Sequence, residues 1–231
     1  MADVADELRD KLCLALDVDD LVEAVRLGKT LSPWFGAAKI GLELFTAAGT
    51  DAIGSLIGLG YEVFLDLKMY DIPTTVNKAS SVLGALGVTY ATYHAQGGVD
   101  VLRAGAEGLR EGAEKAGLPE PKPLAITVLT SDADAPEHIM PKRVLTAVEA
   151  GMAGLVCSAD DVKDATHYAP RLIKVCPGIR PEGTDHHDQA KVATPQAALA
   201  AGADLLVIGR AVTLAADREA AAAAIVDSIL S

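Results

Sequence analysis

The sequence predicts a (β/α)8 barrel, the eight-stranded TIM-barrel fold, and three observations lead to this fold class. Short apolar segments with β-branched residues alternate along the whole chain with longer segments whose apolar residues have helical spacing. Eight such short segments occur in the 231 residues, enough to close a barrel. Some are almost continuously apolar, as in Leu205-Leu206-Val207-Ile208, which is typical of parallel strands covered on both faces.

The expected strands each precede a stretch with helical spacing that ends at a Gly or Pro stop. They cover residues 12–18, 37–44, 62–68, 88–94, 124–129, 154–158, 172–176 and 204–208. A doubly wound open sheet would show the same alternation. Such a sheet normally carries a G-x-G-x-x-G turn after its first strand, however, and this chain has Leu16-Asp17-Val18-Asp19 there. The closed barrel is therefore favoured.

No segment reads as a linker between domains, so residues 1–231 are expected to form one domain. The Pro-rich segment 118–123 is expected to be a stiff loop that leads into the fifth strand. The Ala-rich segment 215–225 has high helix propensity and is expected to be a final packing helix.

Charge and composition exclude several kinds of partner. The net charge of -12 argues against nucleic acid or an anionic membrane, because neutralising many phosphates requires a surplus of Lys and Arg. A small anionic substrate needs only a few local cations. The N-terminal segment is acidic without an apolar signal core, and no apolar run approaches membrane-spanning length. The three cysteines form no C-x-x-C pair, so a cytoplasmic protein with buried, reduced thiols is expected.

Charged residues stand at the ends of the first three expected strands, where barrels of this kind collect their chemistry. Asp17 ends the first strand, Lys39 lies within the second, and Asp66 and Lys68 end the third, shortly before Asp71. Asp66 and Lys68 are two residues apart, so their side chains enter the barrel mouth from the same face. A lysine held among carboxylates stays protonated and well placed, as a proton donor must be. The alternative is a purely structural salt-bridge network of Asp66, Lys68 and Asp71.

The last two expected strands both run into a glycine and an arginine. The sequences are Pro177-Gly178-Ile179-Arg180 and Ile208-Gly209-Arg210. Loops after strands seven and eight are the usual phosphate site of such barrels, because glycine admits backbone N–H groups and arginine grips two oxygens. The polar loop 180–191 is long enough to fold over a ligand. The sequence therefore predicts a barrel of the phosphate-binding type.

The remaining threonines and histidines near the expected strand ends are interpreted as capping or hydrogen-bonding residues. Ile72-Pro73-Thr74-Thr75 looks like the start of a helix, and its threonines can act as caps. His186 and His187 are adjacent and have no matching ligands, so no metal site is expected. His94 is expected to be a hydrogen-bonding residue near the site.

The segment 66–75, DLKMYDIPTT, closely resembles the signature of the orotidine 5′-phosphate decarboxylase family. Further elements resemble the family in the right order and cover nearly the whole chain. They are Leu16-Asp17, Lys39-Ile40-Gly41, Val128-Leu129-Thr130-Ser131, Pro177-Gly178-Ile179-Arg180, Asp188-Gln189 and Ile208-Gly209-Arg210.

The resemblance implies decarboxylation of orotidine 5′-monophosphate to uridine 5′-monophosphate without metal or cofactor, the last step of de novo pyrimidine synthesis. It implies that Lys68 is the proton donor within a charged array formed with Lys39, Asp66 and Asp71. It also implies a homodimer in which Asp71 and Thr75 reach the partner's site. The substrate contacts implied are Asp17 and Lys39 for the ribose, Thr130 or Ser131 for the pyrimidine, and Arg180, Gln189, Gly209 and Arg210 for the phosphate.

Two other readings compete. Metal-dependent relatives such as 3-keto-L-gulonate 6-phosphate decarboxylase or hexulose phosphate synthase share the Asp-x-Lys-x-x-Asp pattern, but the continuation to Thr75 and the Gln189 loop resemble the pyrimidine enzyme. A noncatalytic nucleotide sensor would keep the phosphate site and lose the chemistry. The complete set of Lys39, Asp66, Lys68 and Asp71 speaks against a sensor.

Overall fold

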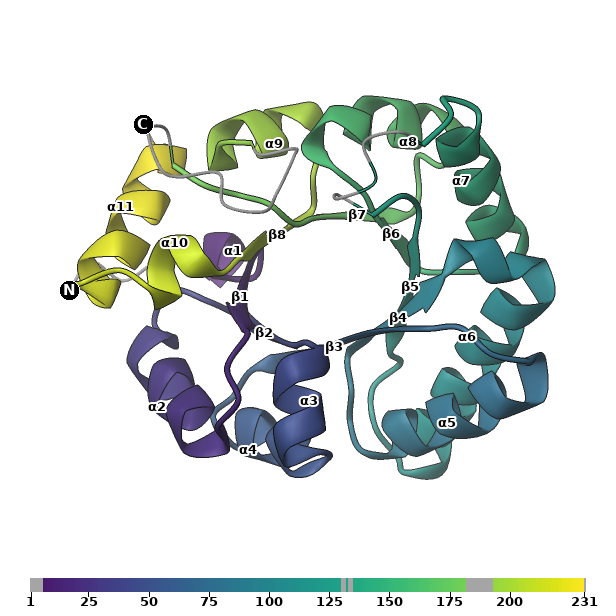
Figure 1. Ribbon diagram of the computed structural model, residues 1–231, viewed down its shortest axis with the longest axis horizontal. Helices are drawn as coiled ribbons and strands as arrows, with labels where there is room; N and C mark the ends of the chain where they lie inside the picture. The colour runs from purple at the N-terminus through teal and green to yellow at the C-terminus, as the bar shows by residue number, and fades with distance from the viewer. Residues whose placement is uncertain (1–5, 130–131, 133–134, 182–192, 231) are drawn as a thin grey trace.

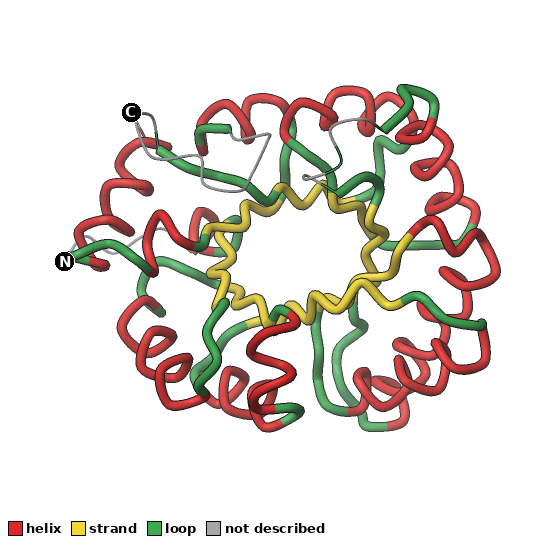
Figure 2. The backbone as a smooth tube through the Cα atoms, viewed as in Figure 1, coloured by secondary structure: helices red, strands yellow, loops and turns green. Residues whose placement is uncertain are grey.

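The computed structural model describes residues 6–129, 132, 135–181 and 193–230. Its parallel strands follow one another around a closed barrel in the order β1 to β8, and β8 pairs with β1 (Figures 1 and 2). The helices form an outer ring around the strands (Figure 2). The (β/α)8 fold predicted from the sequence is confirmed.

The strands are short and parallel throughout. They are β1 (Leu12–Leu16), β2 (Ala37–Ile40), β3 (Glu62–Met69), β4 (Tyr90–His94), β5 (Lys122–Ile126), β6 (Gly154–Val156), β7 (Ile173–Cys176) and β8 (Leu205–Ile208).

The helices connect the strands, and among the described residues none is long and apolar enough to cross a membrane. They are α1 (Asp6–Arg9), α2 (Leu21–Leu31), α3 (Leu42–Ala48), α4 (Asp51–Gly58), α5 (Pro73–Ala85), η1 (Ala95–Gly97), α6 (Gly98–Lys115), α7 (Ile139–Glu149), η2 (Ala159–Asp161), α8 (Val162–Tyr168), α9 (Pro195–Ala201), α10 (Arg210–Thr213) and α11 (Arg218–Leu230).

Several expected boundaries were wrong by two residues or more, and three segments show the physical causes. The second strand stops at Ile40 instead of continuing to residue 44, because the chain turns at Gly41 into α3. The Pro-rich segment runs into β5 itself, where Pro123 still accepts a hydrogen bond from the N–H of Ala153 through its carbonyl. The last helix begins at Arg218 rather than at residue 215, since the Asp217 carboxylate caps it by accepting a hydrogen bond from a backbone N–H of its first turn.

Apolar side chains fill both faces of the sheet, as expected for a covered parallel barrel. Alternate residues of β3 illustrate the division, since Phe64 belongs to the cluster inside the barrel and Leu65 to the larger cluster between strands and helices. At the amino ends of the strands, the Tyr90 hydroxyl donates a hydrogen bond to Glu62 (2.9 Å) and accepts one from Lys122 (3.1 Å). This network occupies the end of the barrel opposite the polar cavity described below.

Helices α5 and α6 pack with their backbones almost in contact. A Cβ atom on Gly84 of α5 would lie 2.0 Å from a backbone oxygen of α6. Cβ atoms on Gly108 and Gly112 of α6 would lie 2.2 and 2.0 Å from backbone oxygens of α5. No side chain fits at these positions, so glycine sets the distance between the two helices.

Candidate active site

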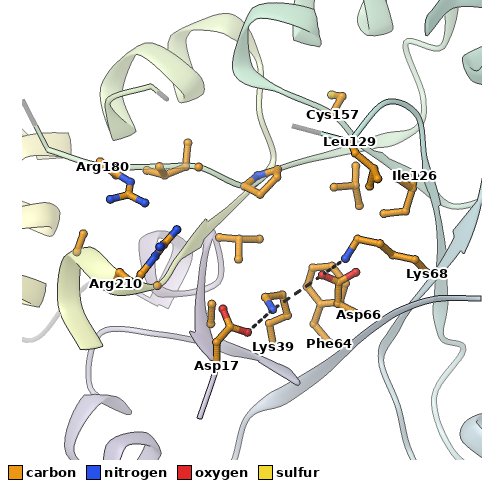
Figure 3. Close-up of a pocket in the computed structure, with 18 of the residues that line it drawn as sticks. Asp17, Lys39, Phe64, Asp66, Lys68, Ile126, Leu129, Cys157, Arg180 and Arg210 are labelled. Atoms are coloured by element: carbon orange, nitrogen blue, oxygen red, sulfur yellow. Dashed lines mark hydrogen bonds and ion pairs between the residues drawn. The ribbon is translucent and has the colours of Figure 1, made fainter. Parts of the chain in front are cut away.

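A polar cavity of about 220 Å³ opens at the carboxyl ends of the strands (Figure 3). Its polar lining comes from two sides of the barrel. Asp17 follows β1, Lys39 lies in β2, and Asp66 and Lys68 lie in β3. On the other side, Arg180 and Arg210 follow β7 and β8 (Figure 3). Apolar residues complete the wall between them, namely Ala15, Phe64, Ile126, Val128, Leu129, Val156, Pro177, Ile179, Val207 and Ala211.

The strand register brings the charged residues of β1, β2 and β3 close together. Ala15 pairs with Lys39, and Lys39 pairs with Phe64, so these three residues stand side by side on neighbouring strands. Asp17 lies two residues after Ala15, and Asp66 lies two residues after Phe64, so the two carboxylates flank Lys39. A lysine from the middle strand is thereby set between two carboxylates.

Negative and positive charges alternate in the order Asp17, Lys39, Asp66 and Lys68, which together form the charged row (Figure 3). The Nζ atom of Lys39 lies 2.9 Å from Asp17 Oδ1 and 3.9 Å from Asp66 Oδ2, and the Nζ atom of Lys68 lies 2.9 Å from the same Asp66 oxygen. Burial by itself lowers the pKa of the Lys39 ammonium, but the Asp17 and Asp66 carboxylates outweigh burial and raise this pKa above its ordinary value. Lys39 is therefore charged at neutral pH, and Asp66 forms ion pairs with the ammonium groups of both Lys39 and Lys68.

Lys68 has an unusual backbone. Its φ angle is 51°, and no other non-glycine residue of the described chain has positive φ. The β3–β4 register shifts there, because the pairs Leu65↔Ala91 and Met69↔Tyr93 enclose more residues on β3 than on β4. Left-handed backbone at a non-glycine residue costs energy and persists only where its surroundings hold it. Sequence reasoning did not anticipate this bulge.

Gly41 is a second site residue whose physical role the sequence did not reveal. A Cβ atom there would lie 2.9 Å from Asp17 Oδ1 and 3.0 Å from Lys39 Nζ. The absent side chain leaves the space in which these two groups meet.

The arginines lie on the side of the cavity away from Lys68 (Figure 3). Arg180 is buried, and Arg210 begins the short helix α10 directly after Gly209. Gly178, with φ of 77°, permits the turn that brings the chain to Arg180. The geometry thus brings Arg180, Gly209 and Arg210 to one region, as the sequence predicted. Gln189, Thr130 and Ser131 lie outside the described residues.

Asp71 and Thr75 do not line the cavity of their own chain. Both are exposed, and the Asp71 carboxylate accepts a hydrogen bond from the backbone N–H of Ile72 (2.6 Å) just before α5 begins. Two neighbouring apolar side chains, Tyr70 and Ile72, are 59% and 66% exposed. This segment has the composition of a contact surface rather than of a solvated loop.

Two further groups near the cavity are neutral. The Nδ1 atom of His94 accepts a hydrogen bond from the N–H of Gln96, as expected of a hydrogen-bonding residue. Its pKa lies below the ordinary value because of burial and the nearby charges of Arg143 and Lys68. Cys157 lines the cavity, and its pKa is raised by a hydrogen bond with Cys176 and by burial. All three cysteines, Cys13 included, are buried and free of disulfides, as predicted.

Within the described ranges, no group of three or more His, Cys, Asp or Glu side chains could hold a metal ion. Both oxygens of Asp66 already accept hydrogen bonds, Oδ2 from Lys68 and Oδ1 from the hydroxyl of Thr92 (3.0 Å). The cavity presents two ammonium groups on one side and guanidinium groups on the other, an arrangement suited to a substrate with two separated negative charges.

Comparison with known proteins identifies relatives over nearly the whole chain. Residues 10–225 match the profile of the protein family described as Orotidine 5'-phosphate decarboxylase / HUMPS family. An orotidine 5'-phosphate decarboxylase of Moorella thermoacetica is 42% identical over 233 residues, covering 96% of this chain and 92% of the relative. Another, of Dichelobacter nodosus, is 43% identical over 219 residues, covering 89% and 93%.

Solved structures agree. The crystal structure of an orotidine 5'-phosphate decarboxylase from Lactobacillus acidophilus matches with a TM-score of 0.78 and 35% identity, over 96% of this chain and 100% of that one. An uncharacterized conserved protein from Geobacillus kaustophilus matches with a TM-score of 0.80 and 29% identity, over 94% and 99%. On the strength of the profile match and these identities, the chain belongs to the orotidine 5'-phosphate decarboxylase / HUMPS family.

Proposed function

We propose that this protein decarboxylates orotidine 5′-monophosphate to uridine 5′-monophosphate and carbon dioxide, the last step of de novo pyrimidine synthesis. The observation that carries the proposal is the cavity itself, in which the Lys39–Asp66–Lys68 row faces Arg180 and Arg210. A nucleotide with a carboxylate on its base and a phosphate on its ribose has its two anionic groups separated in the same way.

Lys68 is the proposed proton donor. The bond between pyrimidine carbon six and the carboxylate breaks, carbon dioxide leaves, and the electron pair stays on carbon six. The Lys68 ammonium stabilises this negative charge and then transfers a proton to it, which gives the C–H bond of the product. The neutral amine regains a proton from solvent, which its 34% exposed side chain can reach in the open cavity.

Asp66 and Lys39 prepare this step. Asp66 holds the Lys68 ammonium at 2.9 Å and places a negative charge next to the substrate carboxylate, which disfavours the bound carboxylate relative to the transition state. Lys39 places a positive charge on the other side of Asp66 and, together with Asp17, contacts the ribose hydroxyls. The pyrimidine edge is assigned to Thr130 or Ser131.

The phosphate is assigned to Arg180, Gln189, Gly209 and Arg210. It lies far from the reacting carbon, so its binding energy can be used to order the charged row around the base. Arginine suits this task because its planar donors bind two phosphate oxygens at once.

The active form is proposed to be a homodimer. Asp71 and Thr75 are exposed and outside their own cavity, next to the exposed apolar side chains of Tyr70 and Ile72, which supports a role across a subunit interface. Each chain is proposed to form one domain over residues 1–231 and to act in the cytoplasm.

The metal-dependent sugar-phosphate enzymes remain the competing function to test. The ammonium groups of Lys39 and Lys68 occupy the surroundings of Asp66, which favours the metal-free reaction. The two relatives named above, 42% and 43% identical to this chain, carry the name of the pyrimidine enzyme.

The test follows the pyrimidine absorbance of orotidine 5′-monophosphate after addition of protein treated with a chelator. Complete conversion to uridine 5′-monophosphate supports both the reaction and its independence of metal. Absence of conversion by a folded protein, with restoration of a sugar-phosphate activity by Mg²⁺, would overturn the proposal.

A further inference from the structure

We infer that Thr92 is a positioning residue that holds both the carboxylate of Asp66 and the backbone of Lys68 in their working geometry. This inference rests on the proposed function for its consequence in catalysis. The hydrogen bonds on which it depends are independent of that function.

Thr92 lies in the middle of β4 and is completely buried, with an exposed fraction of 0%. Its neighbours Ala91 and Tyr93 belong to the outer apolar cluster, so Thr92 points into the barrel. A hydroxyl in such a place is costly unless its donor and its acceptor are both used. Valine has the same shape without this cost, which indicates that the hydroxyl has a role beyond filling space.

The Thr92 hydroxyl uses both its acceptor and its donor for hydrogen bonds to residues of β3. Its oxygen accepts a hydrogen bond from the backbone N–H of Lys68 at 2.9 Å and donates one to Asp66 Oδ1 at 3.0 Å. An N–H group can only donate, so the hydroxyl must use a lone pair toward Lys68. Its single hydrogen then points to Asp66, so the donor and the acceptor in both hydrogen bonds are determined.

The contact with Lys68 explains how the bulge is maintained. At φ of 51° and with the register shifted, the side chain of Thr92 supplies the acceptor for the Lys68 N–H. Without the hydroxyl, this N–H loses its partner and the strained conformation loses its support. The Lys68 side chain would then leave the place from which it reaches the substrate.

The contact with Asp66 determines which oxygen faces the lysines. Oδ1 is held by Thr92, and Oδ2 is left for Lys68 at 2.9 Å and Lys39 at 3.9 Å. Loss of the Thr92 bond lets the carboxylate rotate. One hydroxyl therefore controls the proton donor and the carboxylate beside it.

The experiment compares Thr92→Val, which keeps the shape, with Thr92→Ser, which keeps the hydroxyl. We expect Thr92→Val to lower kcat by about 30-fold or more with KM changed less than about threefold, because the phosphate site is untouched. Thr92→Ser should stay within about threefold of wild type in both constants. Thr127→Val is the matched control, since Thr127 is equally buried and its hydroxyl donates a hydrogen bond to the carbonyl of Val156.

A readout without turnover separates this inference from the proposed function. The amide hydrogen of Lys68 should exchange slowly in wild type and Thr92→Ser and markedly faster in Thr92→Val, as followed by NMR. Should Thr92→Val fail to fold, Thr92→Cys against Thr92→Ser makes the same comparison. Wild-type kcat and unchanged Lys68 exchange in a folded variant without the hydroxyl would overturn the inference, whereas an inactive wild type would overturn the function alone.

Discussion

The Oδ2 atom of Asp66 lies 2.9 Å from the Nζ atom of Lys68, two residues further along the same strand. Residues at this spacing share a face of a regular strand, but here the backbone of Lys68 adopts φ of 51°. The ion pair is therefore formed within a bulge at the end of β3, where the chain can aim a charged side chain into the cavity.

Replacement of Lys68 by alanine should abolish turnover and leave the fold intact. We expect kcat to fall by at least about 10³-fold, because both the stabilising charge and the proton donor are removed. The measurement is substrate absorbance, with thermal unfolding as the check on folding. Lys163→Ala, at an exposed position of α8, is the control. Rapid decarboxylation by Lys68→Ala would exclude lysine as the donor.

Replacement of Arg210 by alanine should act mainly on binding. A charge-assisted contact to phosphate is worth roughly 1.5–3 kcal/mol, so KM should rise by about 10- to 150-fold. Initial rates over a wide range of substrate concentration give both constants. The exposed Arg171→Ala serves as control. An unchanged KM would show that the phosphate is bound elsewhere.

Gly41→Ala should separate the Asp17–Lys39 pair. The new Cβ would lie 2.9 Å from Asp17 Oδ1 and 3.0 Å from Lys39 Nζ, so one of them has to move. We expect kcat/KM to fall by about tenfold or more. Gly54→Ala is the matched control, because a Cβ there meets nothing within 4 Å; it should stabilise α4 by about 0.5–1 kcal/mol. Equal activity of both variants would argue against close contact at Gly41.

The protein should lose stability as the pH falls below about 6.5, in part because of His94. Burial, Arg143 and Lys68 lower its pKa in the folded chain, so the unfolded chain binds a proton at a higher pH. Unfolding then takes up protons, and the free energy of unfolding decreases between the ordinary pKa and the lowered one. Urea unfolding at pH 7.5 and 5.5 measures the effect. His94→Asn, which keeps an acceptor near Gln96, should show a smaller difference, and an identical difference would assign the effect to another group.

Two inactive variants should restore activity when mixed. In the proposed dimer, Asp71 acts in the partner's site, so Lys68→Ala and Asp71→Ala fall in the same site of a hybrid and leave its other site complete. Free exchange of subunits should therefore return about a quarter of wild-type activity. The mixture is assayed after incubation, and each variant alone is the control. A mixture as inactive as its components would contradict the shared site.

The fold was predictable because it depends on patterns that are local. Eight apolar segments with helices between them indicated the barrel, and the strand ends located Asp17, Lys39, Asp66 and Lys68. The end of β2 was misplaced because apolar residues continue past Ile40, into α3. The strand ends where the chain turns at Gly41, which lies against the Asp17–Lys39 pair. The contact of Gly41 with this pair forms only when β1 and β2 are assembled.

The bulge at Lys68 could not have been predicted in the same way. Lysine has no preference for positive φ, and the partner that supports it, Thr92, stands 24 residues away on the neighbouring strand. A threonine in a strand is ordinary by sequence alone. Its importance comes from the pairing of β3 with β4.

The glycine contacts between α5 and α6 also have a consequence for how the protein can move. With backbone against backbone at Gly84, Gly108 and Gly112, there is no compressible layer of side chains between the two helices. We expect the two helices to move together as one rigid unit, which follows the exposed turn at Asp71 on one side and the end of β4 at His94 on the other. A displacement of that turn should therefore also displace the strand end beside the cavity.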